Sequence, residues 1–283
     1  MYIVPNYPIF KQNFRLLPIY KAISFNKVIT KGGRTEPWVI LVNAGNTLKP
    51  YVVKLFKTEL IQLRDSVANE VIGNVLAKEF NLPVPKAALI DLDENFLSTL
   101  RNQELLEILE DRDDRLKFGS ELLEGYFNFD YNAYNLNDVR KIIDIDAVYA
   151  FDNLIRNADR NGQLKPNILI KSTEAYLIDH ELGFELREGI VDDMNNWKWD
   201  RRFCDYHIFS KFLKNSAPKI KREYFHEFGE YLKYLNINNL MPYFNQLVNH
   251  GFSGNKHKLI LDYLTKMKNN SSTFTNVMMS TIL

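Results

Sequence analysis

The chain has a single cysteine, Cys204, among its 283 residues. One thiol cannot form a disulfide framework or a cysteine metal cluster within the chain, and this scarcity is typical of proteins in a reducing cytoplasm. The first residues lack the basic region and long apolar run of a signal peptide. No apolar run approaches the roughly 18 residues that span a bilayer. We therefore expect a cytoplasmic protein with no membrane partner.

An excess of one charge sign is also missing. Lys and Arg number 36 and Asp and Glu number 35, for a formal net charge of +1. This balance does not favour a nucleic-acid partner. Hydrophobic residues make up 46% of the chain and charged residues 25%, as in ordinary globular proteins. The length suits one large domain or a two-lobed one.

Several catalytic motifs are absent as well. The sequence contains no GxGxxG and no GxxxxGK[ST], so dinucleotide binding and P-loop chemistry have no support. It contains no GxSxG, and Cys204 has only distant histidines, which argues against a serine or cysteine hydrolase. The five histidines include no pair with the helical spacing of a zinc site.

What the chain does contain is a change of pattern along its length. Strand-like runs at 37–42 and 50–56 flank the Asn/Gly turn 43–46 and predict an antiparallel hairpin. Apolar residues at helical spacing predict one helix over 59–80 and a second long helix over 138–157. The remaining expectations are a strand at 87–93, an acidic surface helix at 102–114, a strand and crossover at 116–123, two short strands after 166, and mostly helices from 197 onward.

This order predicts an α+β protein with a two-lobed, protein kinase-like fold. Residues 1–120 would form a small β-rich N-lobe with one main helix. Residues 121–283 would form a larger, mainly helical C-lobe around a short catalytic hairpin.

The most informative pattern is a set of polar residues spread over about twenty positions. Asp159 lies in a polar loop, Asn167 enters an apolar run, and Asp179 ends a second apolar run. Phosphoryl transfer with magnesium needs one carboxylate to orient the attacking hydroxyl, and an amide oxygen with another carboxylate to hold the metal. Each aspartate alone could be an ordinary turn residue. Together the three predict catalysis by Asp159 and a metal site at Asn167 and Asp179.

Four further residues are candidates for nucleotide binding. Lys54 lies within an apolar strand, where an ammonium group needs an anionic partner. Glu70, in the middle of the helix expected over 59–80, is a suitable partner. Gly32 and Gly33 lie between strand-like runs and could let backbone N–H groups approach phosphates. The alternatives are a lysine that extends to solvent, a solvated glutamate and a simple turn.

Taken together, these motifs resemble those of the HipA-like kinases, bacterial serine/threonine kinases whose fold is related to protein kinases and phosphatidylinositol kinases. The similarity runs from about residue 25 to 185. The matching segments are Gly32-Gly33, Lys54, Ala68-Asn69-Glu70, Leu82-Pro83-Val84-Pro85, Asn157-Ala158-Asp159-Arg160, Asn167-Ile168-Leu169 and Ile178-Asp179-His180-Glu181.

The resemblance implies ATP and Mg²⁺ as cofactors, a protein substrate, and an antitoxin or regulatory partner. It places Asp159 in the catalytic loop, Asn167 and Asp179 on the metal, and Lys54 on the nucleotide phosphates. One spacing departs from the protein kinase pattern, in which the aspartate and asparagine are five residues apart. Here they are eight apart, so the intervening loop must bulge outward if both side chains are to meet one magnesium ion.

Two other functions remain open at this stage. One is a small-molecule or lipid kinase on the same fold, although a lipid kinase would be expected to show a basic or apolar surface that faces the membrane. The other is a pseudokinase that serves as a nucleotide-sensing or protein-binding module. The presence of Lys54, Asp159 and Asp179 argues against a pure scaffold.

Overall fold

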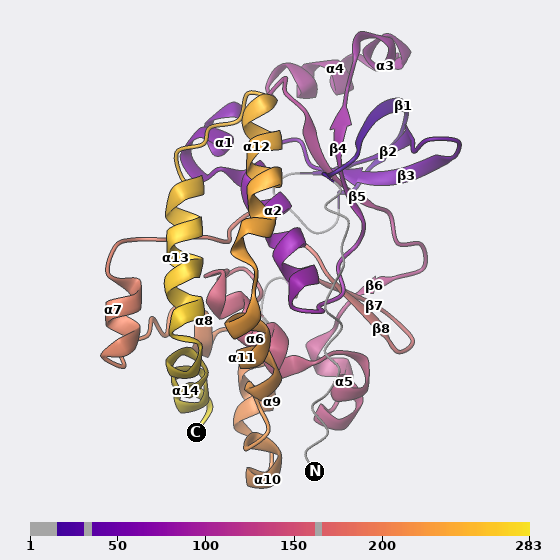
Figure 1. Cartoon of the computed structure of the whole chain (residues 1–283). Helices are drawn as coiled ribbons and strands as arrows, with labels where there is room; N and C mark the ends of the chain where they lie inside the picture. The colour runs from indigo at the N-terminus through magenta and orange to yellow at the C-terminus, as the bar shows by residue number, and fades with distance from the viewer. Residues whose placement is uncertain (1–15, 31–35, 162–165) are drawn as a thin grey trace.

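The computed structural model describes residues 16–30, 36–161 and 166–283 (Figure 1). The chain is a mixed α+β protein with a β-rich N-terminal region and a helical C-terminal region. Among the described residues, no helix is both long enough and apolar enough to cross a membrane.

The β-rich region is a closed barrel with the strand order β1-β2-β3-β5-β4. The parallel pairing of β1 with β4 closes it. The expected hairpin is confirmed, since β2 and β3 pair antiparallel with Trp38 opposite Val53. The strands are β1 (Ile19–Val28), β2 (Trp38–Asn43), β3 (Leu48–Val53), β4 (Ala87–Asp91) and β5 (Lys117–Glu121).

The barrel has its own apolar core, formed by alternate residues such as Trp38, Ile40 and Tyr51 that point inward. Two helices, α3 (Glu94–Thr99) and α4 (Gln103–Glu110), pack against this core with one face each. The acidic helix expected near 102–114 is therefore confirmed as α4.

The single helix predicted over 59–80 is wrong, because the structure has two. They are α1 (Thr58–Arg64) and α2 (Ser66–Glu79), and between them Asp65 adopts a left-handed backbone conformation with φ 54°. Leu63, which lies on the apolar face predicted for the single helix, is 74% exposed in α1. Most of α2, in contrast, is buried between the barrel and the C-terminal helices (Figure 1).

The second long helix, predicted over 138–157, is also divided. Its parts are α5 (Leu136–Ile142) and α6 (Ile145–Leu154). The side chain of Asp144 accepts a hydrogen bond from the Ala147 N–H and caps α6, so the helix begins anew at this point. The two short strands are present as β7 (Ile168–Lys171) and β8 (Glu174–Leu177), and β6 (Phe127–Asn128) joins them in a sheet with the order β6-β7-β8.

From residue 197 onward the chain is mostly helical, as expected. The main hydrophobic core of the protein includes α2, α6 and the last four α-helices. In this core the ring of Phe80 stacks on that of Phe228, with 4.5 Å between the ring centroids. The remaining helical elements are η1 (Tyr131–Ala133), α7 (Ile190–Asn195), α8 (Arg202–Asp205), α9 (Ser210–Lys214), α10 (Pro218–Lys221), α11 (His226–Tyr234), η2 (Ile237–Leu240), α12 (Met241–Asn249), α13 (His257–Asn269) and α14 (Ser271–Ile282).

Candidate functional site

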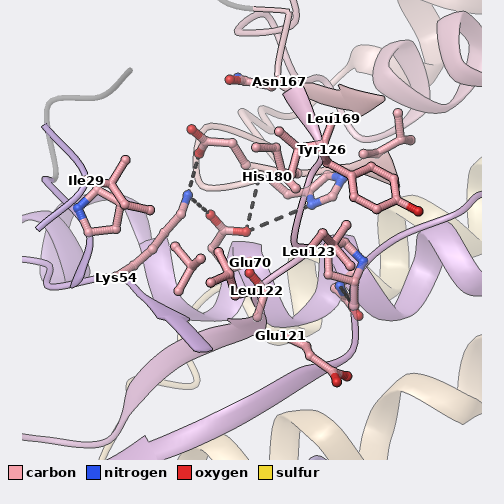
Figure 2. A pocket seen from close by; sticks show the side chains of 18 of the residues that line it. Ile29, Lys54, Glu70, Glu121, Leu122, Leu123, Tyr126, Asn167, Leu169 and His180 are labelled. Atoms are coloured by element: carbon pink, nitrogen blue, oxygen red, sulfur yellow. Dashed lines mark hydrogen bonds and ion pairs between the residues drawn. The ribbon is translucent and has the colours of Figure 1, made fainter. Parts of the chain in front are cut away.

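A cleft of about 400 Å³ lies between the barrel, α2 and the β6-β7-β8 sheet (Figure 2). Val52 and Leu169 line it from opposite sides, and Leu122 and Leu123 line it from the segment that follows β5. Apolar walls of this kind suit a flat aromatic group, whereas the inner end of the cleft is charged.

Lys54 is the centre of the charged end. It follows β3, and its ammonium group donates hydrogen bonds to Glu70 and, at 2.6 Å, to Asp179. A third carboxylate, that of Glu181, lies 3.6 Å from the same nitrogen. The expected contact between Lys54 and Glu70 is thus confirmed, and Figure 2 shows both side chains directed toward each other.

The ionisation of these groups is tightly linked. Burial acts to lower the pKa of Lys54, but the carboxylates of Asp179, Glu70 and Glu181 outweigh it and raise that pKa above its usual value. Burial raises the pKa of Glu70 to about 7, against the opposing effect of Lys54. Lys54 therefore stays positively charged, and three carboxyl groups surround this one ammonium group.

Glu70 is fixed from a second direction by the chain that follows Asp179. The His180 N–H donates to Oε2 of Glu70 over 3.1 Å. This contact requires α2 to pass very close to His180, and Gly73 makes that possible. A Cβ atom added at Gly73 would lie only 2.5 Å from the His180 Cβ. Burial, followed by the charge of Arg160, lowers the pKa of His180 to about 3, so its ring is neutral.

Asp159 and Asn167 meet despite their eight-residue spacing. The Asn167 amide donates to the Asp159 carboxylate with a Nδ2–Oδ2 distance of 3.0 Å. Asn157 accepts a hydrogen bond from the Asp159 N–H at 3.1 Å and so fixes the backbone of the loop. The bulge expected between the two residues falls mostly on 162–165, outside the described residues.

The hairpin formed by β7 and β8 brings Asn167 and Asp179 to the same end of the sheet. Asn167 immediately precedes β7, and its carbonyl accepts a hydrogen bond from the Ile178 N–H at 3.0 Å. Both candidate metal ligands have left-handed backbone conformations, with φ 49° at Asn167 and 66° at Asp179. Such conformations are uncommon outside glycine and persist where surrounding contacts enforce them.

The structure thus gathers Lys54, Glu70, Asn167 and Asp179 on one cleft, with Asp159 joined to it through Asn167. Gly32 and Gly33 lie outside the described residues. Of the flanking residues, Ile29 and Pro37 line the cleft.

Two participants were missed by sequence reasoning. Glu181 belongs to the recognised Asp-His-Glu segment, and its position two residues after Asp179 could have suggested that it shares the same surroundings. Arg160 is fully buried behind the site. An arginine in a polar loop ordinarily indicates a solvated side chain, so its sequence context gave no sign of this burial.

A search of solved structures finds similarity to the crystal structure of a Helicobacter pylori proinflammatory kinase, CtkA. The identity is 13% and the TM-score 0.44, over 92% of this chain and 97% of that one. A comparison with curated proteins finds no match. The family model described as HipA-like kinase matches residues 25–242. The chain belongs to the HipA-like kinase family.

Proposed function

We propose that this protein is an ATP- and Mg²⁺-dependent kinase that phosphorylates serine or threonine side chains of a protein. In this proposal the fold is the two-lobed kinase-like one, with residues 1–120 as the N-lobe and 121–283 as the C-lobe. The nucleotide would lie between them in the cleft.

The observation that carries the proposal is the position of Lys54. A largely buried ammonium group immediately after barrel strand β3 contacts both a helix glutamate and Asp179, which lies 125 residues further along the chain. Phosphate-binding lysines of kinases need this combination, because one carboxylate orients the ammonium group and another lies where the metal binds.

The side chains on the cleft fit a magnesium ion. Glu70, Asp179 and Glu181 each offer a carboxylate oxygen within 4.8 Å of the others, and hard oxygen ligands are those that Mg²⁺ prefers. We assign Asp179 and the amide oxygen of Asn167 as the protein ligands, since the Asn167 nitrogen is engaged with Asp159. When bound, the metal supplies positive charge that offsets the charge of the nucleotide phosphates.

The other residues would bind the nucleotide, position the groups that bind it, or accept the substrate proton. Lys54 would hold nucleotide phosphates and Glu70 would position Lys54. Gly32 and Gly33 would contribute backbone N–H groups to the phosphates. Asp159 would accept the proton of the attacking hydroxyl, and its hydrogen bond from Asn167 holds the carboxylate in a fixed orientation for that purpose. The apolar walls near Val52 and Leu169 would enclose the adenine base.

A protein substrate follows from the family rather than from the cleft. The same source predicts an antitoxin or regulatory partner, and both stay predictions. The experiment below separates this function from that of a small-molecule or lipid kinase and from that of a pseudokinase.

The test is incubation of the purified protein with radiolabelled ATP and Mg²⁺, first alone and then with a cell lysate. A labelled protein band with phosphoserine or phosphothreonine supports the proposal. Label that appears only in small molecules or lipids would indicate the alternative kinases, and binding of ATP without transfer would indicate a pseudokinase.

Asp159→Asn is the decisive variant. We expect the loss of proton transfer to reduce the rate by about a hundredfold or more, while the affinity for ATP stays close to that of the parent. Asp192→Asn is a matched control, because Asp192 is exposed on α7, outside the cleft. Equal rates for Asp159→Asn and the control would remove Asp159 from the mechanism.

A further inference from the structure

Directly behind the cleft lies a fully buried ion pair that the proposed roles do not use. The guanidinium of Arg160 donates from Nε to Oδ2 of Asp152 over 2.5 Å, and both side chains are 0% exposed. Burial acts to raise the pKa of Asp152, but Arg160 and His207 outweigh it and hold that pKa below its usual value. The pair is therefore ionised inside the protein.

The other contacts of Arg160 are with the backbone of the site. Its Nη1 donates to the carbonyl of Asn167 and lies 3.5 Å from the carbonyls of Pro166 and Ile178. Arg160 thereby contacts the residue that precedes β7, Asn167, and the residue that follows β8, Ile178. Ile178 immediately precedes Asp179. Arg160 also directly follows Asp159 in the chain.

Asp152 fixes the direction of the guanidinium, and it is itself fixed. It is part of α6, and its second oxygen accepts a hydrogen bond from Asn157 at 3.2 Å. His207 contacts the first oxygen through Nε2 at 3.0 Å. Because His207 Nδ1 accepts from the Phe209 N–H, Nε2 carries the ring proton and donates to Asp152.

We infer that Arg160 and Asp152 form a positioning pair that sets the relative placement of Asp159, Asn167 and Asp179. Asn167 and Asp179 have left-handed backbones, and a guanidinium held by α6 can keep the adjoining carbonyls in place. The inference rests on the proposed function, because it assigns the purpose of the pair to the metal-binding residues.

A single substitution is a poor test, since removal of one partner leaves the other charge buried and unpaired. The double variant Arg160→Met/Asp152→Asn removes both charges and keeps one side-chain oxygen at position 152, which can accept a hydrogen bond from either Asn157 or His207. We expect it to fold, with a melting temperature within a few degrees of the parent. Arg160→Lys is a second variant, since it keeps the charge but replaces the fork with a single ammonium group.

Three measurements report on the placement of the metal-binding residues rather than on the stability of the fold. The Mg²⁺ concentration for half-maximal nucleotide binding, measured by calorimetry, should rise by about tenfold in the double variant. The affinity for metal-free ATP should be unchanged, because the contacts of Arg160 described above are with α6 and the hairpin and not with the strand that precedes Lys54. Hydrogen exchange of the amides at 167–179, measured without nucleotide, should become faster.

A folded double variant with the Mg²⁺ dependence and exchange of the parent would overturn the inference and leave the proposed function intact. If the double variant does not fold, the Arg160→Lys variant is used instead. A Mg²⁺ dependence of nucleotide binding equal to that of the parent would then overturn the inference. If the parent protein binds nucleotide with no dependence on Mg²⁺, the proposed function fails and the positioning role falls with it. A higher Mg²⁺ concentration for half-maximal nucleotide binding, with an unchanged affinity for metal-free ATP, supports the positioning role of Arg160 and Asp152.

Discussion

The replacement of Glu70 by glutamine tests the charge balance around Lys54. In the native protein three carboxylates surround a single ammonium group, and burial raises the pKa of Glu70 from 4.5 to about 7. The native state therefore holds a proton on Glu70 more tightly than the unfolded chain does. By linkage, the free energy of unfolding must fall as the pH rises from about 4.5 to about 7.

The size of the effect follows from the same shift. A rise from 4.5 to about 7 corresponds to roughly 3 kcal/mol, present in full below the unfolded pKa and lost once the pH exceeds the folded one. Glutamine cannot titrate, so the Glu70→Gln variant lacks this decline. Its amide can still accept a hydrogen bond from the His180 N–H, and Lys54 keeps Asp179 and Glu181 as partners.

The assay is urea denaturation of parent and variant at half-unit steps from pH 4.5 to 8. We expect the stability of Glu70→Gln relative to the parent to increase by roughly 2–3 kcal/mol over this range. Glu107→Gln, an exposed position on α4, is the control and should run parallel to the parent. Parallel curves for Glu70→Gln as well would show that Glu70 is ionised throughout, and the description of the charge cluster would be wrong.

Three further outcomes are expected. Asp179→Ala should weaken the binding of Mg²⁺-ATP but not of metal-free ATP, and equal calorimetric affinities in Mg²⁺ would show that Asp179 is not a ligand. Lys54→Met should cost about 3–5 kcal/mol at pH 8 and less at pH 5.5, because the carboxylates left unpaired can then take up protons; equal losses in urea denaturation at both pH values would contradict this. Gly73→Ala should lower stability by about 1–3 kcal/mol through the clash with His180, and an unchanged melting temperature would mean that α2 can shift to make room.

Much of the β-rich region could be predicted from local signals. The β2–β3 hairpin has alternating and branched residues on each side of an Asn/Gly turn, and its pairing is local in sequence. The points at which helices begin and end were harder to predict. Helical spacing continues through Asp65, yet the chain bends there because Asp65 adopts a left-handed conformation that spacing alone does not reveal.

The candidate site divides in the same way. Lys54 and Glu70 stand out because each is a charge among apolar neighbours, and their contact follows from a strand packed against a helix. Arg160 does not stand out, because its partner Asp152 is on another helix and its other contacts are to backbone carbonyls. Backbone carbonyls carry no sequence signal, so a positioning role of this kind emerges only from the folded chain.

The burial of α2 has a consequence for attempts to divide the chain. Although α2 precedes residue 120, its apolar side chains belong to the same core as α6 and the C-terminal helices, and Phe80 contacts Phe151 as well as Phe228. A fragment that begins at residue 121 would present this apolar surface to water, and one that ends at 120 would carry an uncovered helix. Expression of the two halves as separate polypeptides would therefore yield aggregation-prone pieces, and co-expression would be needed to reunite Glu70 with the backbone of His180.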